Sequence, residues 1–191
     1  MPRFLVPALA FALGLLGLCV ALFLALPGGG ARTAASVGGP FSLVAQDGRR
    51  VSDSDFKGMP VLVFFGYTHC PDVCPSTLSD LSLVLAKLPP GAKFGALFIT
   101  VDPERDTPAA LKDYMASFDP RILALSGARA ELEPVWKAFR VFARKIPGKD
   151  GDYAMDHTAL VYLMDRTGEF AGSFNLSQSP ADAARAFKKA L

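Results

Sequence analysis

The segment that decides the fold is Val61–Leu78, which reads VLVFFGYTHCPDVCPSTL. Its first six residues form a short, continuous apolar run, which is typical of a strand buried on both faces of a sheet. A second run of this kind, Phe94–Val101 (FGALFITV), follows a stretch in which leucines recur at helical spacing. We therefore expect a helix over 76–88 between the two strands, with Pro75 at its first position. Strand, helix and strand in this order predict an α/β fold with a largely parallel central sheet.

The rest of the chain continues this alternation. The expected elements are, in order, a hairpin with an Asp47-Gly48 turn, a helix from Pro108 to about Phe118 with Thr107 as its N-cap, a strand over Ile122–Leu125, a helix over Ala128–Phe139, a strand over Ala159–Met164, a strand over Glu169–Phe174 and a helix over Pro180–Ala190. The late strand-turn-strand unit and the final helix resemble the second half of a thioredoxin-like fold. We therefore expect a single thioredoxin-like α/β domain over residues 41–191.

The N-terminus is a different kind of segment. Residues 5–26 form an uncharged run, and about 20 apolar residues suffice to cross the hydrocarbon core as a helix. We expect a transmembrane anchor over 4–26 and, from its Gly-rich composition, a flexible linker over 27–40. A cleaved signal peptide and a lipoprotein signal at Cys19 are the alternatives. Because Arg3 precedes the run, we expect a single-pass protein of the bacterial inner membrane with its C-terminal domain in the periplasm.

Charge argues against one class of partner. The domain after residue 40 contains all 18 acidic residues and all of the 20 basic residues except Arg3 and Arg32, so it is formally neutral. Nucleic-acid binding draws much of its affinity from neutralising phosphates. A neutral domain therefore predicts that the chain does not bind nucleic acid.

Two cysteines follow the first central strand at the edge where open α/β sheets gather functional groups. Cys70 and Cys74 are four positions apart, so on a helical turn both sulfurs can point at one spot. A helix N-terminus also lowers thiol pKa values. The pair alone is compatible with a structural disulfide, with thiol–disulfide exchange, or with binding of a soft metal such as Cu(I) or Zn. A disulfide around so short a loop stabilises little, and a metal would need a third ligand.

The chain has two histidines that could supply this ligand. His69 adjoins Cys70, and because adjacent side chains diverge we expect it to be an ordinary surface or core residue. His157 lies just before the strand Ala159–Met164, whose entry lies beside the cysteine motif in thioredoxin-like architecture. We therefore expect His157 to take part in the site. A Cys₂His set is soft enough for Cu(I), and imidazole also suits Cu(II).

Three ordered motifs carry a resemblance to a known family. They are GYTHCPDVCPSTL (66–78), VDPERDTP (101–108) and DHT (156–158). Together with the N-terminal helix, they resemble the Sco/SenC family of copper chaperones. The resemblance implies a thioredoxin-like fold with copper held by Cys70, Cys74 and His157. It also implies delivery of copper to the CuA centre of cytochrome c oxidase subunit II, or to another copper-accepting protein.

Two enzymatic functions compete with that of a metallochaperone. A thiol–disulfide reductase that keeps the CuA cysteines reduced would use Cys70 and Cys74 as its redox pair and would not need His157. Peroxide reduction is the second alternative. It is disfavoured because Thr68 lies two residues before Cys70, whereas the peroxidase pattern places the threonine three residues before the cysteine.

The remaining polar motifs are expected to be structural. In VDPERDTP we expect local ion pairs among Asp102, Arg105 and Asp106. We expect Asp72 to favour the N-terminus of the following helix, with a role as a weak extra metal ligand as the alternative. A basic stretch is formed by Arg140, Arg144, Lys145 and Lys149. It is expected to be a solvated face, with a docking loop for an acidic partner as the alternative hypothesis.

Overall fold

The computed structural model describes residues 13–18, 37–148 and 151–191. It divides into two units, Met1–Ala35 and Ser36–Leu191. In the first unit, the described residues 13–18 are helical and their side chains are exposed. Across the described ranges, no helix is both long and apolar enough to cross a membrane. The anchor and linker expected over residues 4–40 lie mostly outside the described residues, so both remain predictions.

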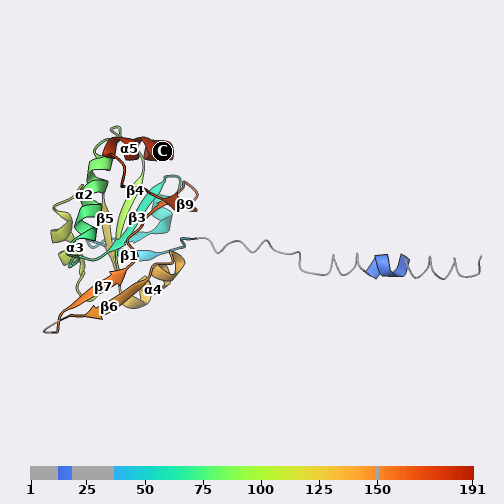
Figure 1. The fold of residues 1–191 in the computed structure, drawn as a ribbon, viewed down its shortest axis with the longest axis horizontal. Helices are drawn as coiled ribbons and strands as arrows, with labels where there is room; N and C mark the ends of the chain where they lie inside the picture. The colour runs from blue at the N-terminus through green and yellow to red at the C-terminus, as the bar shows by residue number, and fades with distance from the viewer. Residues whose placement is uncertain (1–12, 19–36, 149–150) are drawn as a thin grey trace, which may run out of the picture. The chain divides into compact units, whose positions relative to one another are not determined.

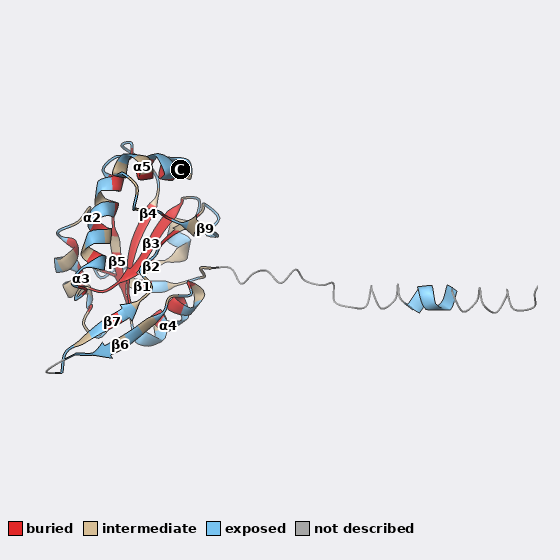
Figure 2. Ribbon diagram, in the orientation of Figure 1, coloured by how far each residue is buried: buried red, intermediate tan, exposed pale blue. Residues whose placement is uncertain are grey.

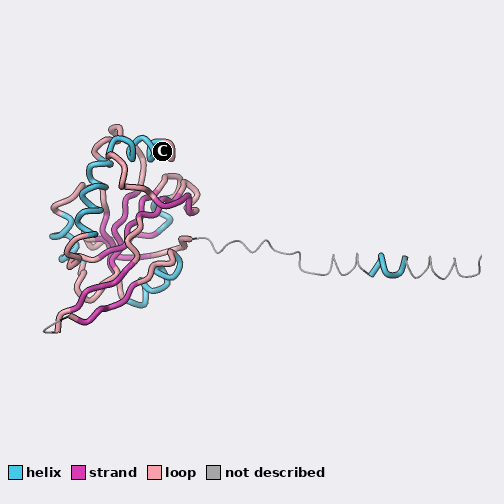
Figure 3. The backbone as a smooth tube through the Cα atoms, in the orientation of Figure 1, coloured by secondary structure: helices cyan, strands magenta, loops and turns pink. Residues whose placement is uncertain are grey.

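A mixed sheet forms the centre of the second unit (Figures 1 and 3). In the described part of the chain it has seven strands in the order β2-β1-β5-β4-β3-β8-β9. The strands are β1 (Ser42–Ala45), β2 (Arg50–Ser52), β3 (Val61–Gly66), β4 (Gly95–Thr100), β5 (Leu123–Ser126), β8 (Val161–Met164) and β9 (Phe170–Ser173). Strands β3, β4 and β5 are parallel, while β1 and β8 flank them in antiparallel orientation. The predicted α/β class with a parallel centre is confirmed.

Helices connect and cover these strands. They are α2 (Val73–Leu85), α3 (Pro108–Met115), α4 (Arg129–Ala138) and α5 (Pro180–Lys188), with a short 3₁₀ helix η1 (Asp53–Phe56). The crossovers through α2 and α3 step across the sheet in the same direction, so right-handed connections place both helices on one face (Figure 1). Every residue of β3 and β4 is buried, as Figure 2 shows in red, so both faces of the sheet are covered at these two strands.

The start of α3 agrees with the sequence prediction, whereas that of α2 does not. Thr107 caps α3 by accepting a hydrogen bond from Ala110 N, and Pro108 is its first residue. Helix α2 begins at Val73 rather than at Pro75 or Ser76, so Pro75 is its third residue. The reason lies in packing.

Cys74 lies one turn before Leu78 and extends the same buried stripe of α2, so the helix begins early enough to include it. Cys74, Leu78 and Leu81 are all 0% exposed. Pro75 is tolerated in the first turn because the backbone N–H groups there have no intrahelical acceptor.

A second, two-stranded sheet is absent from the sequence prediction. It consists of β6 (Ala143–Pro147) and β7 (Tyr153–His157), and it projects from one end of the main sheet (Figure 1, orange). Neither strand shows the alternation of apolar and polar residues that marks a half-buried strand. In these two strands only Met155 is buried. The basic stretch expected as a solvated face or docking loop therefore lies partly on β6, and Lys149 falls outside the described residues.

Candidate metal centre

The pairing of the strands brings three segments to one edge of the sheet. In the parallel ladder Gly66 is opposite Thr100, so the loops that follow β3 and β4 leave the sheet side by side. Strand β8 is antiparallel to β3 and pairs Val161 with Phe64. The chain that enters β8 therefore arrives where the chain that leaves β3 departs. This places residues before β8 next to the cysteine loop.

The two cysteines occupy the loop after β3 and the first turn of α2. Cys74 is completely buried, and Cys70 is 9% exposed. The backbone N–H of Cys74 donates a hydrogen bond to Cys70 Sγ at 3.3 Å. Both cysteines are free thiols. The start of α2 thus holds one sulfur by burial and the other by a backbone hydrogen bond.

The ring of His157 faces this pair from the end of β7. Its Nε2 lies 3.6 Å from Cys74 Sγ, and its Nδ1 lies 3.1 Å from the carbonyl oxygen of Thr158. A carbonyl oxygen only accepts, so Nδ1 carries the ring proton and Nε2 presents its lone pair. Tyr67 packs edge-on against the imidazole, with the ring centroids 5.6 Å apart. The side chain of His157 is therefore oriented by contacts on two sides.

These three residues have the arrangement that a soft metal ion requires. One sulfur from each cysteine and one nitrogen of His157 all lie within 4.8 Å of one another. Metal–sulfur and metal–nitrogen bonds are about 2.0–2.3 Å long, so the donors of a three-coordinate ion lie roughly 4 Å apart. A small inward movement of the side chains would bring all three onto one ion. Two thiolates and an imidazole suit copper, as well as zinc.

Burial controls the protonation of the donors. It lowers the pKa of His157, so the imidazole is neutral at pH 7 and ready to bind a cation. It raises the pKa of the Cys74 thiol. This contradicts the expectation that the helix N-terminus would lower thiol pKa values. Cys74 has no exposed surface, and loss of hydration, which disfavours the thiolate, is the largest cause of the raised pKa.

Close packing behind the site fixes the position of the Cys74 sulfur. A Cβ atom placed on Gly66 would lie 2.6 Å from Phe98 Cε2 and 2.8 Å from Cys74 Sγ. Separations under 3 Å between such atoms are severe clashes. The last residue of β3 must therefore be glycine for the sulfur to occupy its present place.

His69 is not part of the three-residue group. Its side chain is exposed, and its Nδ1 lies 2.9 Å from Thr68 Oγ1. The sequence prediction that it would diverge from Cys70 agrees with this geometry. Among the described residues, the group able to hold a metal consists of Cys70, Cys74 and His157.

The aspartate that ends VDPERD supports the cysteine loop, a role that the sequence prediction missed. Asp106 is completely buried and accepts hydrogen bonds from Thr68 N at 3.2 Å, Thr68 Oγ1 at 2.6 Å and Thr100 Oγ1 at 2.6 Å. The expected ion pair of Asp102 with Arg105 is present, but Asp106 is held by threonine donors instead. Burial raises the pKa of Asp106, and the threonine hydrogen bonds oppose that shift. The sequence signal for this role was the pair of aspartates, Asp102 and Asp106, that closely follows the buried strand β4.

The basic stretch is partly neutralised by acidic neighbours. Arg144 lies 3.4 Å from Asp156, and Lys145 pairs with Glu104. Three of these side chains are exposed and that of Lys145 is partly exposed, and such pairs contribute little to stability. The docking hypothesis for this stretch remains a prediction.

Known proteins resemble the chain over the whole of this domain. The SCO1/SenC family model matches residues 29–191. Protein sco1 of Schizosaccharomyces pombe is 39% identical over 155 residues, which make up 78% of this chain and 59% of that protein. The chain spans about half the length of the curated relatives that it matches first.

Solved structures show the same likeness. The structure of Bradyrhizobium japonicum ScoI with copper bound is 55% identical, with a TM-score of 0.80, over 82% of this chain and 100% of that chain. BsSco, described as having a disulfide switch and as a member of the Sco family of cytochrome c oxidase assembly proteins, is 27% identical, with a TM-score of 0.64, over 81% and 92%. The expected thioredoxin-like α/β fold is confirmed by these matches. A relative thus binds copper on this fold, and this chain has a Cys-Cys-His group able to bind a metal.

Proposed function

The chain belongs to the SCO1/SenC family, and from that premise we propose that it is a membrane-tethered copper chaperone. Copper is its cargo, held by Cys70, Cys74 and His157 and passed to the CuA centre of cytochrome c oxidase subunit II. The observation that carries the proposal is the convergence of two sulfurs and one imidazole nitrogen within 4.8 Å.

The chemistry of the donors supports copper as the cargo. Soft thiolates favour Cu(I), and the imidazole allows the same site to hold Cu(II). The contact of His157 Nδ1 with the Thr158 carbonyl supplies the second partner that metal-binding histidines usually have. The match to a copper-bound ScoI supports the same assignment.

Release of the cargo follows from the different burial of the ligands. His157 is partly exposed, whereas both cysteines are buried. An incoming ligand of the acceptor therefore reaches the copper ion from the side of His157 and replaces the imidazole first. The thiolates follow by the same exchange, and no covalent intermediate with the protein is needed. Assembly of cytochrome c oxidase, named for the family of BsSco, is the process that we infer for this chain.

The experiment is a titration of the reduced protein with Cu(I), beside the variants His157→Ala and His69→Ala. We expect one copper per chain in the wild type. Loss of an outer partner of a metal ligand costs about 10–100-fold in affinity, so loss of His157 itself should cost at least that much. His69→Ala is the matched control and should bind as the wild type does. Equal affinities in all three proteins would contradict the proposed ligand set.

A second candidate function, thiol–disulfide reduction, is favoured by one observation. Cys70 and Cys74 are both free, and the N–H of Cys74 points at the Cys70 sulfur. In this reaction the two thiols would become a disulfide while a disulfide of the acceptor becomes two thiols. His157→Ala separates the functions, because the reductase would keep its activity and the chaperone would lose copper. Activity towards an oxidised CuA domain is the measurement.

A further inference from the structure

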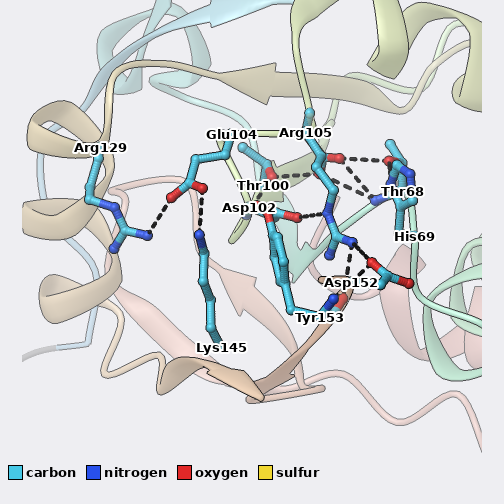
Figure 4. A network of polar contacts seen from close by, with 11 residues as sticks. Thr68, His69, Thr100, Asp102, Glu104, Arg105, Arg129, Lys145, Asp152 and Tyr153 are labelled. Atoms are coloured by element: carbon cyan, nitrogen blue, oxygen red, sulfur yellow. Dashed lines mark hydrogen bonds and ion pairs between the residues drawn. The ribbon is translucent and has the colours of Figure 1, made fainter. Parts of the chain in front are cut away.

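The loop that follows β4 contacts the two segments that supply the metal-binding side chains, namely the cysteine loop and the strand that ends in His157. Figure 4 shows its network of polar contacts. On one side Asp106 holds Thr68 in the cysteine loop. On the other side Arg105 reaches the strand that ends in His157. Because the loop is anchored in the buried end of β4, it can fix the two segments relative to each other. Asp102 in this loop is 1% exposed.

Arg105 binds the start of β7 through hydrogen bonds and a stacking contact. Its Nε donates to Asp102 Oδ2 at 2.5 Å, and its Nη1 donates to Asp152 Oδ1 at 3.1 Å and to the carbonyl oxygen of Tyr153 at 3.0 Å. The guanidinium also lies over the ring of Tyr153, with Cζ 3.7 Å from its centroid. The Tyr153 hydroxyl donates to Asp102 Oδ1 at 2.8 Å and so closes a ring of contacts. The Arg105 side chain is only 17% exposed, so water competes weakly for these contacts.

The hairpin that carries His157 needs contacts with the rest of the domain to keep its position. Strands β6 and β7 form a sheet of their own, with no ladder to the main sheet among the described strands. An isolated two-stranded hairpin is marginally stable in water. The ion pair of Lys145 with Glu104 is exposed and therefore weak. The partly buried polar contacts that tie Tyr153 to the loop after β4 are those of Arg105 with its carbonyl oxygen and of Asp102 with its hydroxyl.

The position of His157 follows from that of Tyr153. The two residues are the ends of β7, about 14 Å apart along an extended strand. The Arg105 guanidinium also lies 5.8 Å from the ring of Tyr67, which packs edge-on against His157. Arg105 thus contacts the near end of the strand directly and the far end through Tyr67.

We propose that Arg105 is a positioning residue that clamps the β6–β7 hairpin to the end of β4 and so holds His157 Nε2 toward Cys74 Sγ. The inference rests on the proposed function, because it takes His157 as a copper ligand. It adds that the histidine is pre-positioned by a residue that touches neither copper nor any of its ligands. A lysine would keep the charge but would lack the planar guanidinium that donates to Asp102, Asp152 and Tyr153 and stacks on the Tyr153 ring.

The test uses the full, reduced chain with Arg105→Met, Arg105→Lys and Arg129→Met. Arg129 is the matched control, because it also pairs with a residue of this loop, Glu104 at 3.5 Å, but its ion pairs do not include the hairpin. The first readout needs no copper. Amide hydrogen exchange over 143–147 and 153–157 should be at least about tenfold faster in Arg105→Met, intermediate in Arg105→Lys and unchanged in Arg129→Met.

The second readout is a double-mutant cycle on Cu(I) affinity. Arg105→Met should weaken binding by about 10–100-fold when His157 is present and should have no effect in the His157→Ala background. A general structural role would instead weaken binding equally in both backgrounds. That result, or unchanged exchange in the hairpin, would overturn the inference.

Two further outcomes are distinguishable. If the wild type binds no copper, the proposed function fails, and hydrogen exchange in the metal-free protein still tests the clamp. If Arg105→Met does not fold, as judged by circular dichroism, Tyr153→Leu removes the stacking surface and the hydroxyl from the hairpin side. The same increase in exchange is expected for it, and an unchanged rate would contradict the proposal.

Discussion

The Nε2 atom of His157 lies 3.6 Å from the Sγ atom of Cys74, and the opposite ring nitrogen of His157 is held by the carbonyl oxygen of Thr158 at 3.1 Å. The second contact fixes the proton on Nδ1 and thereby directs a lone pair at the sulfur. A ligand that is already neutral and oriented need not lose a proton or turn before it binds copper. This relationship leads to the first prediction.

In the reduced, metal-free protein His157 should be the Nδ1–H tautomer and should protonate below its ordinary pKa of 6.5, because burial disfavours the imidazolium. Nitrogen NMR of the ring across a pH series measures both properties. His69, which is exposed, provides a second histidine signal in the same spectra. An Nε2–H tautomer, or protonation of His157 above pH 6.5, would contradict the geometry.

Copper binding should release the proton of Cys74. Burial raises the pKa of this thiol, so it is protonated at neutral pH, whereas a metal binds the thiolate. The apparent affinity for Cu(I) should therefore increase with pH. Calorimetry at pH 7 in two buffers of different ionisation enthalpy counts the protons, and we expect at least one per copper. No proton release would show that Cys74 is not a ligand.

Gly66→Ala should disturb the metal centre as well as the fold. The added Cβ would overlap Phe98 and the Cys74 sulfur, and overpacking of this kind costs about 1–3 kcal/mol in unfolding free energy. The displaced sulfur should also weaken copper binding. Gly95→Ala is the matched control, because its Cβ would lie 2.8 Å from Phe56 Cδ1 at the opposite end of the neighbouring strand. It should lower stability without changing copper affinity, and equal losses of affinity would refute the local explanation.

Asp106→Asn should change how stability depends on pH. Burial raises the pKa of Asp106 above 3.8, so the folded state binds its proton more tightly than the unfolded state does. The stability that this group contributes is therefore present at low pH and is lost as pH rises through the raised pKa. The unfolding free energy of the wild type minus that of Asp106→Asn should decrease as the pH rises above 3.8 and through the raised pKa. Urea unfolding at several pH values measures it, and a constant difference would contradict the shift.

The parts of the fold that the sequence predicts are those set by neighbouring residues. The continuous apolar runs at β3 and β4 identify buried strands, and Thr107 with Pro108 identifies the start of α3. The predicted start of α2 lies two or three residues late, because it leaves Cys74 outside the apolar stripe of the helix. Its place in the buried stripe one turn before Leu78 was the available signal.

The hairpin β6–β7 could not be predicted in this way. Its strands bury only Met155, so they carry no apolar alternation, and their attachment depends on Arg105 and Asp102 some fifty residues earlier. The same reason explains why Arg105 was expected to make only a local ion pair. Its contact with Asp102 is local, but its contacts with Asp152 and Tyr153 are not.

The sequence by itself determined the α/β class, the two cysteines one helical turn apart and, through three ordered motifs, the family. These depend on side-chain periodicity, on spacing and on residue identity, all of which are present before folding. The sequence also predicted that His157 joins the cysteines. Only the tertiary structure decided that its Nε2 is the nitrogen that lies 3.6 Å from Cys74 Sγ, that burial raises rather than lowers the pKa of Cys74, and that Arg105 secures the hairpin. Orientation, hydration and pKa depend on atoms that become neighbours only when the strands pair.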